Sequence, residues 1–221
     1  MVHTANVATK AVLFDLDGTL ADSLADIAAS TNACLGGMGL PTHAASAYPS
    51  FVGHGIGVLV QRALAPLGAA DRESELLEAL RIHYGAHSTD QTVAYPGIDA
   101  LLGTLRDRGV RLAVVSNKPD DMTQRIVQAL FADAGFEFVT GERPAAPRKP
   151  DPTGILLACR TLGVDPHDAV YVGDTPVDVR AAAAAGLRSV AVTWGFRDRA
   201  TLEAAGPHHL VDTAAAILDC L

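Results

Sequence analysis

Cysteines, aromatic residues and positive charges are all scarce in this chain of 221 residues, and each shortage excludes a class of protein. The three cysteines, Cys34, Cys159 and Cys220, have no CxxC spacing, which argues against a disulfide framework or a cysteine-bound zinc and indicates a reducing, cytoplasmic compartment. Lysine and arginine number 17 against 25 aspartates and glutamates, and the net charge of −8 argues against a nucleic-acid partner. There is no basic start followed by an apolar stretch and no run of roughly 18 to 20 apolar residues, so we expect neither export nor a membrane partner.

The chain is rich instead in small apolar residues. An apolar share of 49% with only 5% aromatic residues suits helices packed on a parallel sheet better than an aromatic-rich β-sandwich. Short apolar runs alternate with helix-length stretches, which is the pattern of successive β-α-β units and predicts an α/β fold with a Rossmann-like parallel sheet flanked by helices. The predicted strands are 11–14, 111–115, 169–172 and 189–192, and the predicted helices are 98–108, 120–131, 153–162 and 177–185.

The stretch after the first predicted strand has helical patterns only. Residues 24–35, 56–64 and 73–84 have helical patterns, and no run between them is typical of a buried strand. Tyr95-Pro96-Gly97 then marks a turn back to the alternating pattern. We therefore expect an all-helical domain, residues 21–93, inserted after the first strand of a core that consists of residues 1–20 and 94–221.

Two carboxylates follow the first predicted strand, in Phe14-Asp15-Leu16-Asp17-Gly18. The carboxyl ends of parallel strands are where open α/β sheets bind ligands. Two anions this close require a cation, and a hard, oxygen-seeking Mg²⁺ would neutralise them and attract a phosphate. Asp and Gly also form ordinary turns, so this motif alone leaves a purely structural role open.

Three further segments place polar side chains at predicted strand ends. Ser116-Asn117 offers a hydroxyl and backbone N–H groups in front of a helix, both suited to phosphate oxygens. Lys149 supplies one ammonium, and Asp174 supplies a further metal ligand. Four strand ends would thus carry an acid, a hydroxyl, a lysine and an acid in that order. Purely structural roles for all four residues are a poor explanation of this set.

This ordered set resembles the haloacid dehalogenase superfamily of phosphotransferases. Its four motifs match residues 15–19, 116–117, 149–150 and 173–178, and the match spans nearly the whole core. The helical insertion after the first motif resembles the type 1 cap of that superfamily. Within the superfamily, residues 51–55, 115–119 and 191–196 look most like bacterial phosphoglycolate phosphatases.

The resemblance implies a Mg²⁺-dependent phosphatase that acts on a small phosphate monoester, 2-phosphoglycolate, through an aspartyl-phosphate. Asp15 would be the nucleophile, and Asp17 would protonate the leaving group and then activate water. Asp15, the backbone carbonyl of Asp17 and Asp174 would hold Mg²⁺. Lys149 would pair with both Asp15 and the phosphate, and Asp178 would fix Lys149 or a metal-bound water.

The resemblance also implies which residues hold the substrate. Ser116 and Asn117 would bind phosphoryl oxygens, and Thr19 and Gly173 would order the loops around them. The leaving group would be read by the cap, where Gly53 and His54 are candidates. An exposed loop histidine explains His54 equally well. Arg62 and Lys118 are the other candidates for a substrate carboxylate, and His208-His209 is interpreted as an exposed pair because no third metal ligand has suitable spacing.

Several alternatives share these motifs. A sugar-phosphate mutase, a pyrophosphatase and a nucleotide phosphatase of the same superfamily differ mainly in the cap. A phospho-accepting signalling domain also combines an aspartate, an acidic pair, a hydroxyl and a lysine, and Asp17 with the helical insertion argues against it. Asp17 also argues against a dehalogenase. We expect a small phosphorylated metabolite as the partner and a monomer or homodimer.

Overall fold

The apolar run predicted to begin the sheet forms strand β1 (Ala11–Phe14), and none of its side chains is exposed. In the computed structural model, which describes residues 9–221, β1 pairs in parallel with β4 (Arg111–Pro119) on one side and β6 (Ala169–Gly173) on the other. Alternate β1 side chains pack into two hydrophobic clusters on opposite faces. Burial on both faces is typical of the centre of a parallel sheet.

Within residues 9–221 the sheet has six parallel strands in the order β5-β4-β1-β6-β7-β8. The sequence predicted a parallel sheet, and this is confirmed, but it missed the two edge strands β5 (Phe136–Glu142) and β8 (His209–Val211). β5 is only partly buried and β8 has three residues, so neither produces the continuous apolar run of a central strand. The remaining strand is β7 (Arg188–Val192).

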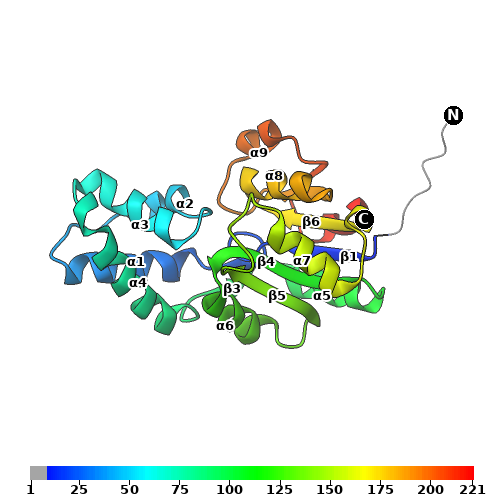
Figure 1. Ribbon diagram of the computed structural model, residues 1–221, viewed down its shortest axis with the longest axis horizontal. Coiled ribbons are helices and arrows are strands. Elements are labelled where there is room, and N and C mark those ends of the chain that lie inside the picture. Colours follow the sequence, from blue (N-terminus) through cyan, green and yellow to red (C-terminus); the bar gives the residue numbers. More distant parts are fainter. Residues whose placement is uncertain (1–8) are drawn as a thin grey trace.

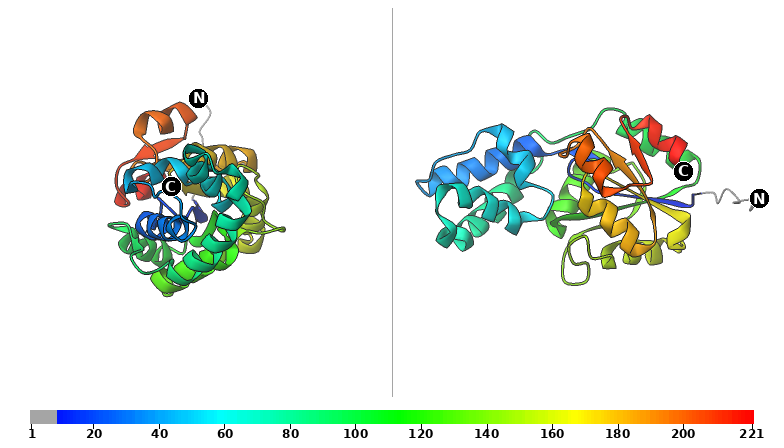
Figure 2. Two further views of the ribbon diagram at one scale, coloured as in Figure 1. Left: turned by 90° about the vertical axis from the view of Figure 1, so that its left-hand side faces the viewer. Right: turned by 90° about the horizontal axis from the view of Figure 1, so that it is seen from above.

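Helices cover both faces of the sheet, as Figure 2 shows. Helices α5 (Ile98–Asp107) and α6 (Asp120–Phe131) contribute side chains to the cluster on one face. Helices α7 (Thr153–Leu162) and α8 (Pro176–Ala185) contribute to the cluster on the other face. All four agree with the predicted helices to within one residue at each end. Helix α9 (Arg199–Ala205) packs against α8.

The long segment after β1 forms a separate group of helices beyond one end of the sheet (Figure 1). They share a hydrophobic cluster of their own, so they pack mainly on one another. We call this group the helical unit; it consists of α1 (Leu24–Gly37), α2 (Tyr48–Phe51), α3 (Ile56–Leu64) and α4 (Glu73–His87).

The segment 21–93, predicted to be helical throughout, begins and ends in a short antiparallel ribbon of β2 (Ala21–Asp22) and β3 (Val93–Ala94). Two-residue strands leave no periodic signal in a sequence. The buried carboxylate of Asp26 reinforces this ribbon by accepting hydrogen bonds from the backbone N–H groups of Gln91 and Thr92, at 2.9 to 3.0 Å. The two crossings between the sheet and the helical unit therefore lie side by side.

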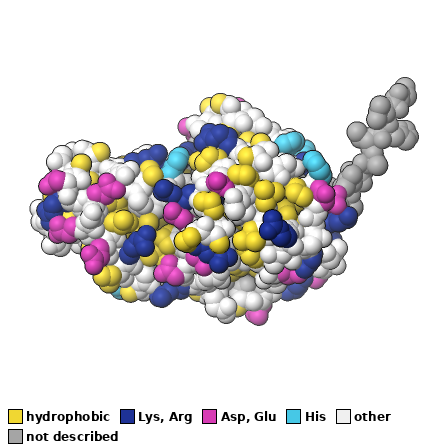
Figure 3. Space-filling model, viewed as in Figure 1, with side chains coloured by type: hydrophobic (Ala, Val, Ile, Leu, Met, Phe, Trp, Pro, Cys, Tyr) yellow, Lys and Arg dark blue, Asp and Glu magenta, His cyan; other side chains and the backbone are white. Residues whose placement is uncertain are grey.

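One face of the molecule shows how its charges are distributed. On the face shown in Figure 3, acidic and basic side chains are interspersed and form no continuous basic area, in keeping with the net charge of −8. Within residues 9–221, none of the helices has the length and apolar character needed to cross a membrane.

Candidate active site

The three central strands bring distant polar residues to one edge of the sheet. Asp15 follows β1, Ser116 and Lys118 lie in the last part of β4, and Asp174 follows β6. Because these strands are parallel neighbours, their carboxyl ends meet. The sequence placed Lys149 at a strand end as well, and this was wrong: it lies seven residues beyond the end of β5, in the loop that leads to α7.

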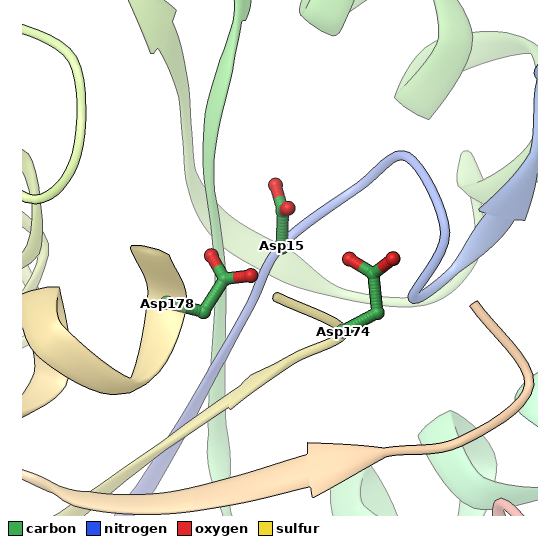
Figure 4. A group of neighbouring side chains, drawn as sticks. All are labelled: Asp15, Asp174 and Asp178. Carbon is green, nitrogen blue, oxygen red and sulfur yellow. The ribbon is translucent and has the colours of Figure 1, made fainter. Parts of the chain in front are cut away.

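Three buried carboxylates gather at this edge, those of Asp15, Asp174 and Asp178, each offering an oxygen within 4.8 Å of the others (Figure 4). Oδ1 of Asp174 is buried and has no hydrogen-bond partner among the residues that the structure describes. The described contacts of Asp15, from the Leu16 N–H and from Lys149, both fall on its Oδ1. Unclaimed carboxylate oxygens in a buried acidic cluster fit a hard divalent cation such as Mg²⁺.

Burial opposes ionisation of this cluster when no metal is bound. It raises the pKa of Asp15 to about 6, although the Lys149 ammonium partly offsets the shift. Burial, together with the neighbouring Asp178 and Asp15, also raises the pKa of Asp174 well above its usual range. A bound dication would reverse both shifts, because it favours the charged form of each ligand.

Lys149 lies between two of these carboxylates and is almost fully buried. Its Nζ is 2.9 Å from Asp15 Oδ1 and 2.7 Å from Asp178 Oδ1, and it donates to the Tyr171 hydroxyl at 2.8 Å. Burial alone lowers the pKa of Lys149, but the two carboxylates raise it well above its usual value. The ammonium is therefore a fixed positive charge beside Asp15. Tyr171, which orients it, was not identified from the sequence.

Asp178 is oriented by the start of α8. Its Oδ2 accepts from the N–H of Thr175 at 3.0 Å and from the Thr175 hydroxyl at 2.6 Å, which completes a capping box. Both of its oxygens are thereby in use, so its contacts position Lys149. Gly173, predicted to support this site, makes the arrangement possible: a Cβ there would lie 2.4 Å from the Asp178 side chain.

The Asp17 carboxylate lies outside the group formed by Asp15, Asp174 and Asp178 and has partners of its own. It accepts from the ammonium of Lys118 at 2.8 and 2.9 Å and from the Ser23 hydroxyl at 2.5 Å. Lys118 also donates to the hydroxyl of Tyr84, on α4 of the helical unit, at 2.6 Å. Burial lowers the pKa of Lys118, but Asp17 and Tyr84 raise it above its usual value overall. Sequence analysis missed Ser23 and Tyr84.

The loop after β4 connects the parts of the site. Asn117 accepts from the backbone N–H of Lys149 at 2.6 Å and donates to the carbonyl oxygen of Gly53 at 3.3 Å. The Ser116 hydroxyl accepts from the Lys118 N–H at 3.3 Å. Thr19 is fully buried, and its hydroxyl has no hydrogen-bond partner among residues 9–221. Ser116 and Asn117 line one cavity together with Asp15, whereas Thr19 does not line it.

The loop 49–55 of the helical unit is held to the core by its backbone. Arg197 donates to the carbonyl oxygens of Pro49 and Val52, at 2.5 and 2.8 Å, and Arg148 donates to that of His54 at 3.1 Å. Neither arginine was given a role from the sequence, although Arg148 directly precedes Lys149. Arg62 donates to the carbonyl of Ser50 and so stays within the helical unit.

A cavity of about 60 Å³ lies between the core and the helical unit. Its polar lining consists of Asp15, Asp17, Ser116, Asn117 and Lys118, together with the Tyr84 hydroxyl. Of the predicted substrate-binding residues, Gly53, Asn117 and Lys118 line it, and Thr19, His54 and Arg62 do not. His208 and His209 are exposed, as interpreted from the sequence.

Gly195 gives a test of how tightly Asp174 is enclosed. A Cβ at this position would lie 2.3 Å from Asp174 Cβ and 2.4 Å from the carbonyl oxygen of Gly18. We expect Gly195→Ala to displace Asp174 and to destabilise the protein by about 1–3 kcal/mol, measured by urea unfolding. Gly103→Ala is the matched control, because nothing lies within 4 Å of its added methyl group. Equal stability of the two variants would contradict the packing described.

The comparisons with known proteins agree with this geometry. The haloacid dehalogenase-like hydrolase family matches residues 12–192. The chain is 36% identical over 213 residues to a phosphoglycolate phosphatase of Pseudomonas putida, covering 95% of this chain and 78% of that protein. It is 37% identical to a phosphoglycolate phosphatase of Chromobacterium violaceum, covering 96% of both.

The fold is also that of a solved structure. A crystal structure from Lactobacillus delbrueckii subsp. bulgaricus, described as a candidate phosphoglycolate phosphatase, superposes with a TM-score of 0.92 at 32% identity and covers 96% of this chain and 98% of its own. The family match spans most of the sequence and includes all four motifs around the acidic cluster. The chain therefore belongs to the haloacid dehalogenase-like hydrolases, as its motifs predicted.

Proposed function

We propose that this protein is a Mg²⁺-dependent phosphatase that hydrolyses 2-phosphoglycolate to glycolate and phosphate. The observation that carries the proposal is the position of Asp15, which faces a cavity, touches the fixed ammonium of Lys149 and lies in a buried acidic cluster. The naming of the relatives as phosphoglycolate phosphatases supports the choice of substrate.

In this proposal Asp15 attacks phosphorus in line with the leaving oxygen and becomes an aspartyl-phosphate. Asp17, which lines the same cavity, protonates the leaving alkoxide and then takes a proton from the attacking water. Ser116 and the N–H of Asn117 hold phosphoryl oxygens, and Lys149 keeps Asp15 aligned. Mg²⁺, held by Asp15, Asp174 and the backbone carbonyl of Asp17, would offset the negative charge of the phosphoryl group.

The two parts of the chain would have separate roles. We propose residues 1–20 and 94–221 as the catalytic core and residues 21–93 as a cap that opens to admit substrate and closes to exclude water. Loop 49–55, held by its carbonyl groups, would be the part of the cap that leaves the core on opening. A cytoplasmic enzyme that acts as a monomer or homodimer completes the proposal, and the three buried, unpaired cysteines are compatible with that location.

The metal gives a prediction with a defined pH dependence. The raised pKa of Asp15, about 6, means that without metal this carboxyl group stabilises the fold most fully below pH 4 and loses that contribution as the pH rises through about 6. Mg²⁺ requires the charged form, so its stabilisation grows over the same range. We expect millimolar Mg²⁺ to raise the melting temperature by about 5 °C at about pH 7.5 and hardly at all at about pH 5.

The control for this experiment is Asp174→Asn, which removes one proposed ligand and should abolish the Mg²⁺ effect at both pH values. Differential scanning calorimetry measures the melting temperatures of both proteins with and without Mg²⁺ at the two pH values. An equal shift at the two pH values, or an undiminished shift in the variant, would place Mg²⁺ elsewhere.

The substrate is tested by Mg²⁺-dependent phosphate release from a panel of 2-phosphoglycolate, sugar phosphates, nucleotides and pyrophosphate. We expect kcat/KM for 2-phosphoglycolate to exceed the others at least about tenfold. Preference for another ester would assign a different phosphatase of the same family. Isomerised sugar phosphate without net phosphate release would indicate a mutase, and a stable phosphorylated protein without turnover would indicate a signalling domain.

A further inference from the structure

We propose that Lys118 is the residue that recognises the carboxylate of the leaving group, and that Tyr84 of the cap positions its ammonium for this purpose. The inference rests on the proposed function and deepens it, because it names the group that selects a short anionic substrate. It starts from the walls of the cavity.

The part of the cavity that faces the helical unit is apolar. Its walls are formed by aliphatic and thioether side chains, namely those of Ile27, Val52, Ile56, Leu59, Leu80 and Met122. Such walls offer no hydrogen bonds to the hydroxyl groups of a sugar. They exclude water and so strengthen any charge interaction inside the cavity. A short leaving group with a single polar end suits this space.

Among the described residues that line the cavity, Lys118 is the only one with a positive charge. Its ammonium is held from two sides, by the carboxylate of Asp17 in the core and by the hydroxyl of Tyr84 in the helical unit. The Tyr84 ring also lies beneath it, with Nζ 4.6 Å from the ring centroid. The ammonium is thus fixed at the boundary between the phosphate side and the apolar side.

The other cations near the boundary have different tasks. The Lys149 ammonium contacts Asp15 and Asp178, and Lys149 does not line the cavity. The guanidinium groups of Arg62, Arg148 and Arg197 donate to backbone carbonyl oxygens of the loop 49–55 and do not line the cavity. A carboxylate that enters the cavity therefore meets Lys118.

The contacts of Tyr84 indicate that it does more than pack in the interior of the helical unit. Its hydroxyl accepts from Lys118 at 2.6 Å, the shortest of the three contacts of that ammonium. Without it the ammonium would be drawn toward Asp17 only, away from the leaving group. Tyr84 is therefore a positioning residue that acts through Lys118. It connects the cap to the ammonium that binds the substrate carboxylate.

The experiment compares the binding of two unreactive phosphonates in the presence of Mg²⁺ by calorimetry. 2-Carboxyethylphosphonate replaces the bridging oxygen of 2-phosphoglycolate with a methylene group, and propylphosphonate carries a methyl group in place of the carboxylate. We expect the wild-type protein to bind the carboxylate compound about 10- to 100-fold more tightly. Lys118→Met should reduce this ratio to within about threefold of unity, and Tyr84→Phe, which keeps the ring, should reduce it by about three- to tenfold.

Lys10→Met is the control, because Lys10 is an exposed lysine that pairs with Asp168 outside the cavity. This variant should show the same ratio of affinities for the two phosphonates as the wild type. If Lys118→Met binds propylphosphonate and keeps the wild-type ratio, the inference is wrong while the proposed function stands. If Lys118→Met does not fold, an unchanged ratio in Tyr84→Phe overturns the inference. Equal binding of the two phosphonates by the wild type overturns it as well, and the substrate panel then shows independently whether 2-phosphoglycolate is hydrolysed.

Discussion

Asp15→Asn is expected to lower phosphate release from 2-phosphoglycolate by at least about 10⁴-fold while leaving the fold intact. The amide has the size and shape of the carboxylate but is neutral and does not attack phosphorus. Because burial already raises the pKa of Asp15, its removal takes a poorly solvated charge away from the cluster. Stability without metal should therefore be close to that of the wild type, which circular dichroism and thermal unfolding measure.

The matched control for this variant is Asp107→Asn. Asp107 has an exposed side chain at the end of α5 and does not line the cavity, and its replacement should leave both rate and stability unchanged. If Asp15→Asn keeps more than about a hundredth of the wild-type rate, another group is the nucleophile.

Lys149→Met is the second substitution with a large expected effect. It leaves the buried carboxylates of Asp15 and Asp178 without their ammonium, and loss of one partner of a buried ion pair costs about 3–5 kcal/mol. We expect this loss of unfolding free energy at about pH 7.5 without Mg²⁺, and at least about a 10³-fold loss of kcat/KM, since the nucleophile and the phosphate both lose their aligning charge.

The destabilisation by Lys149→Met should depend on pH. The raised pKa of Lys149 keeps its ammonium charged at both pH values, whereas the pKa of Asp15, about 6, leaves that carboxyl group largely neutral at about pH 5. Lys149 lowers the pKa of Asp15 in the wild type, so its removal raises that pKa further. Asp15 is then neutral at about pH 5 in the variant, and the loss of stability should shrink there.

Tyr171→Phe is the control for Lys149→Met. It removes the hydrogen bond that the hydroxyl accepts from the ammonium and the one that it donates to the carbonyl oxygen of Val115. Both carboxylates stay paired, so a loss of about 1–2 kcal/mol is expected. Urea unfolding at the two pH values compares the three proteins. A loss in Lys149→Met that is the same at both pH values, or no larger than that of Tyr171→Phe, would contradict the role given to Lys149.

The centre of the fold could be predicted from the sequence because β1, β4 and β6 are buried on both faces. Their apolar runs leave an unambiguous pattern, and the polar residues that follow them mark one edge of the sheet. The edge strands β5 and β8 are short or partly exposed and leave no such pattern. Because β5 was not predicted, Lys149 was assigned to a strand end and not to the loop before α7. Its selection as a site residue did not depend on that assignment, because it came from the motif at residues 149–150.

The contacts between the helical unit and the rest of the chain could not be predicted, and the reason is again physical. Tyr84 reaches Lys118 across 34 residues of sequence, and Arg197 reaches Val52 across 145. Such pairs depend on how two separately packed units meet, which neither propensity nor periodicity describes. Arg62 is the opposite case. The sequence made it a candidate to bind a substrate carboxylate, but its guanidinium donates to a backbone carbonyl oxygen of the helical unit.

The central claim is that Asp15 accepts the phosphoryl group. Rapid quenching with acid during turnover of 2-phosphoglycolate, followed by borohydride reduction of acyl phosphates and peptide mass spectrometry, tests it most directly. We predict a modified residue at Asp15 that forms and decays on the timescale of turnover and is absent from Asp15→Asn. Turnover at full rate with no modification of Asp15 at any quench time, or with phosphate on another residue, would contradict the claim.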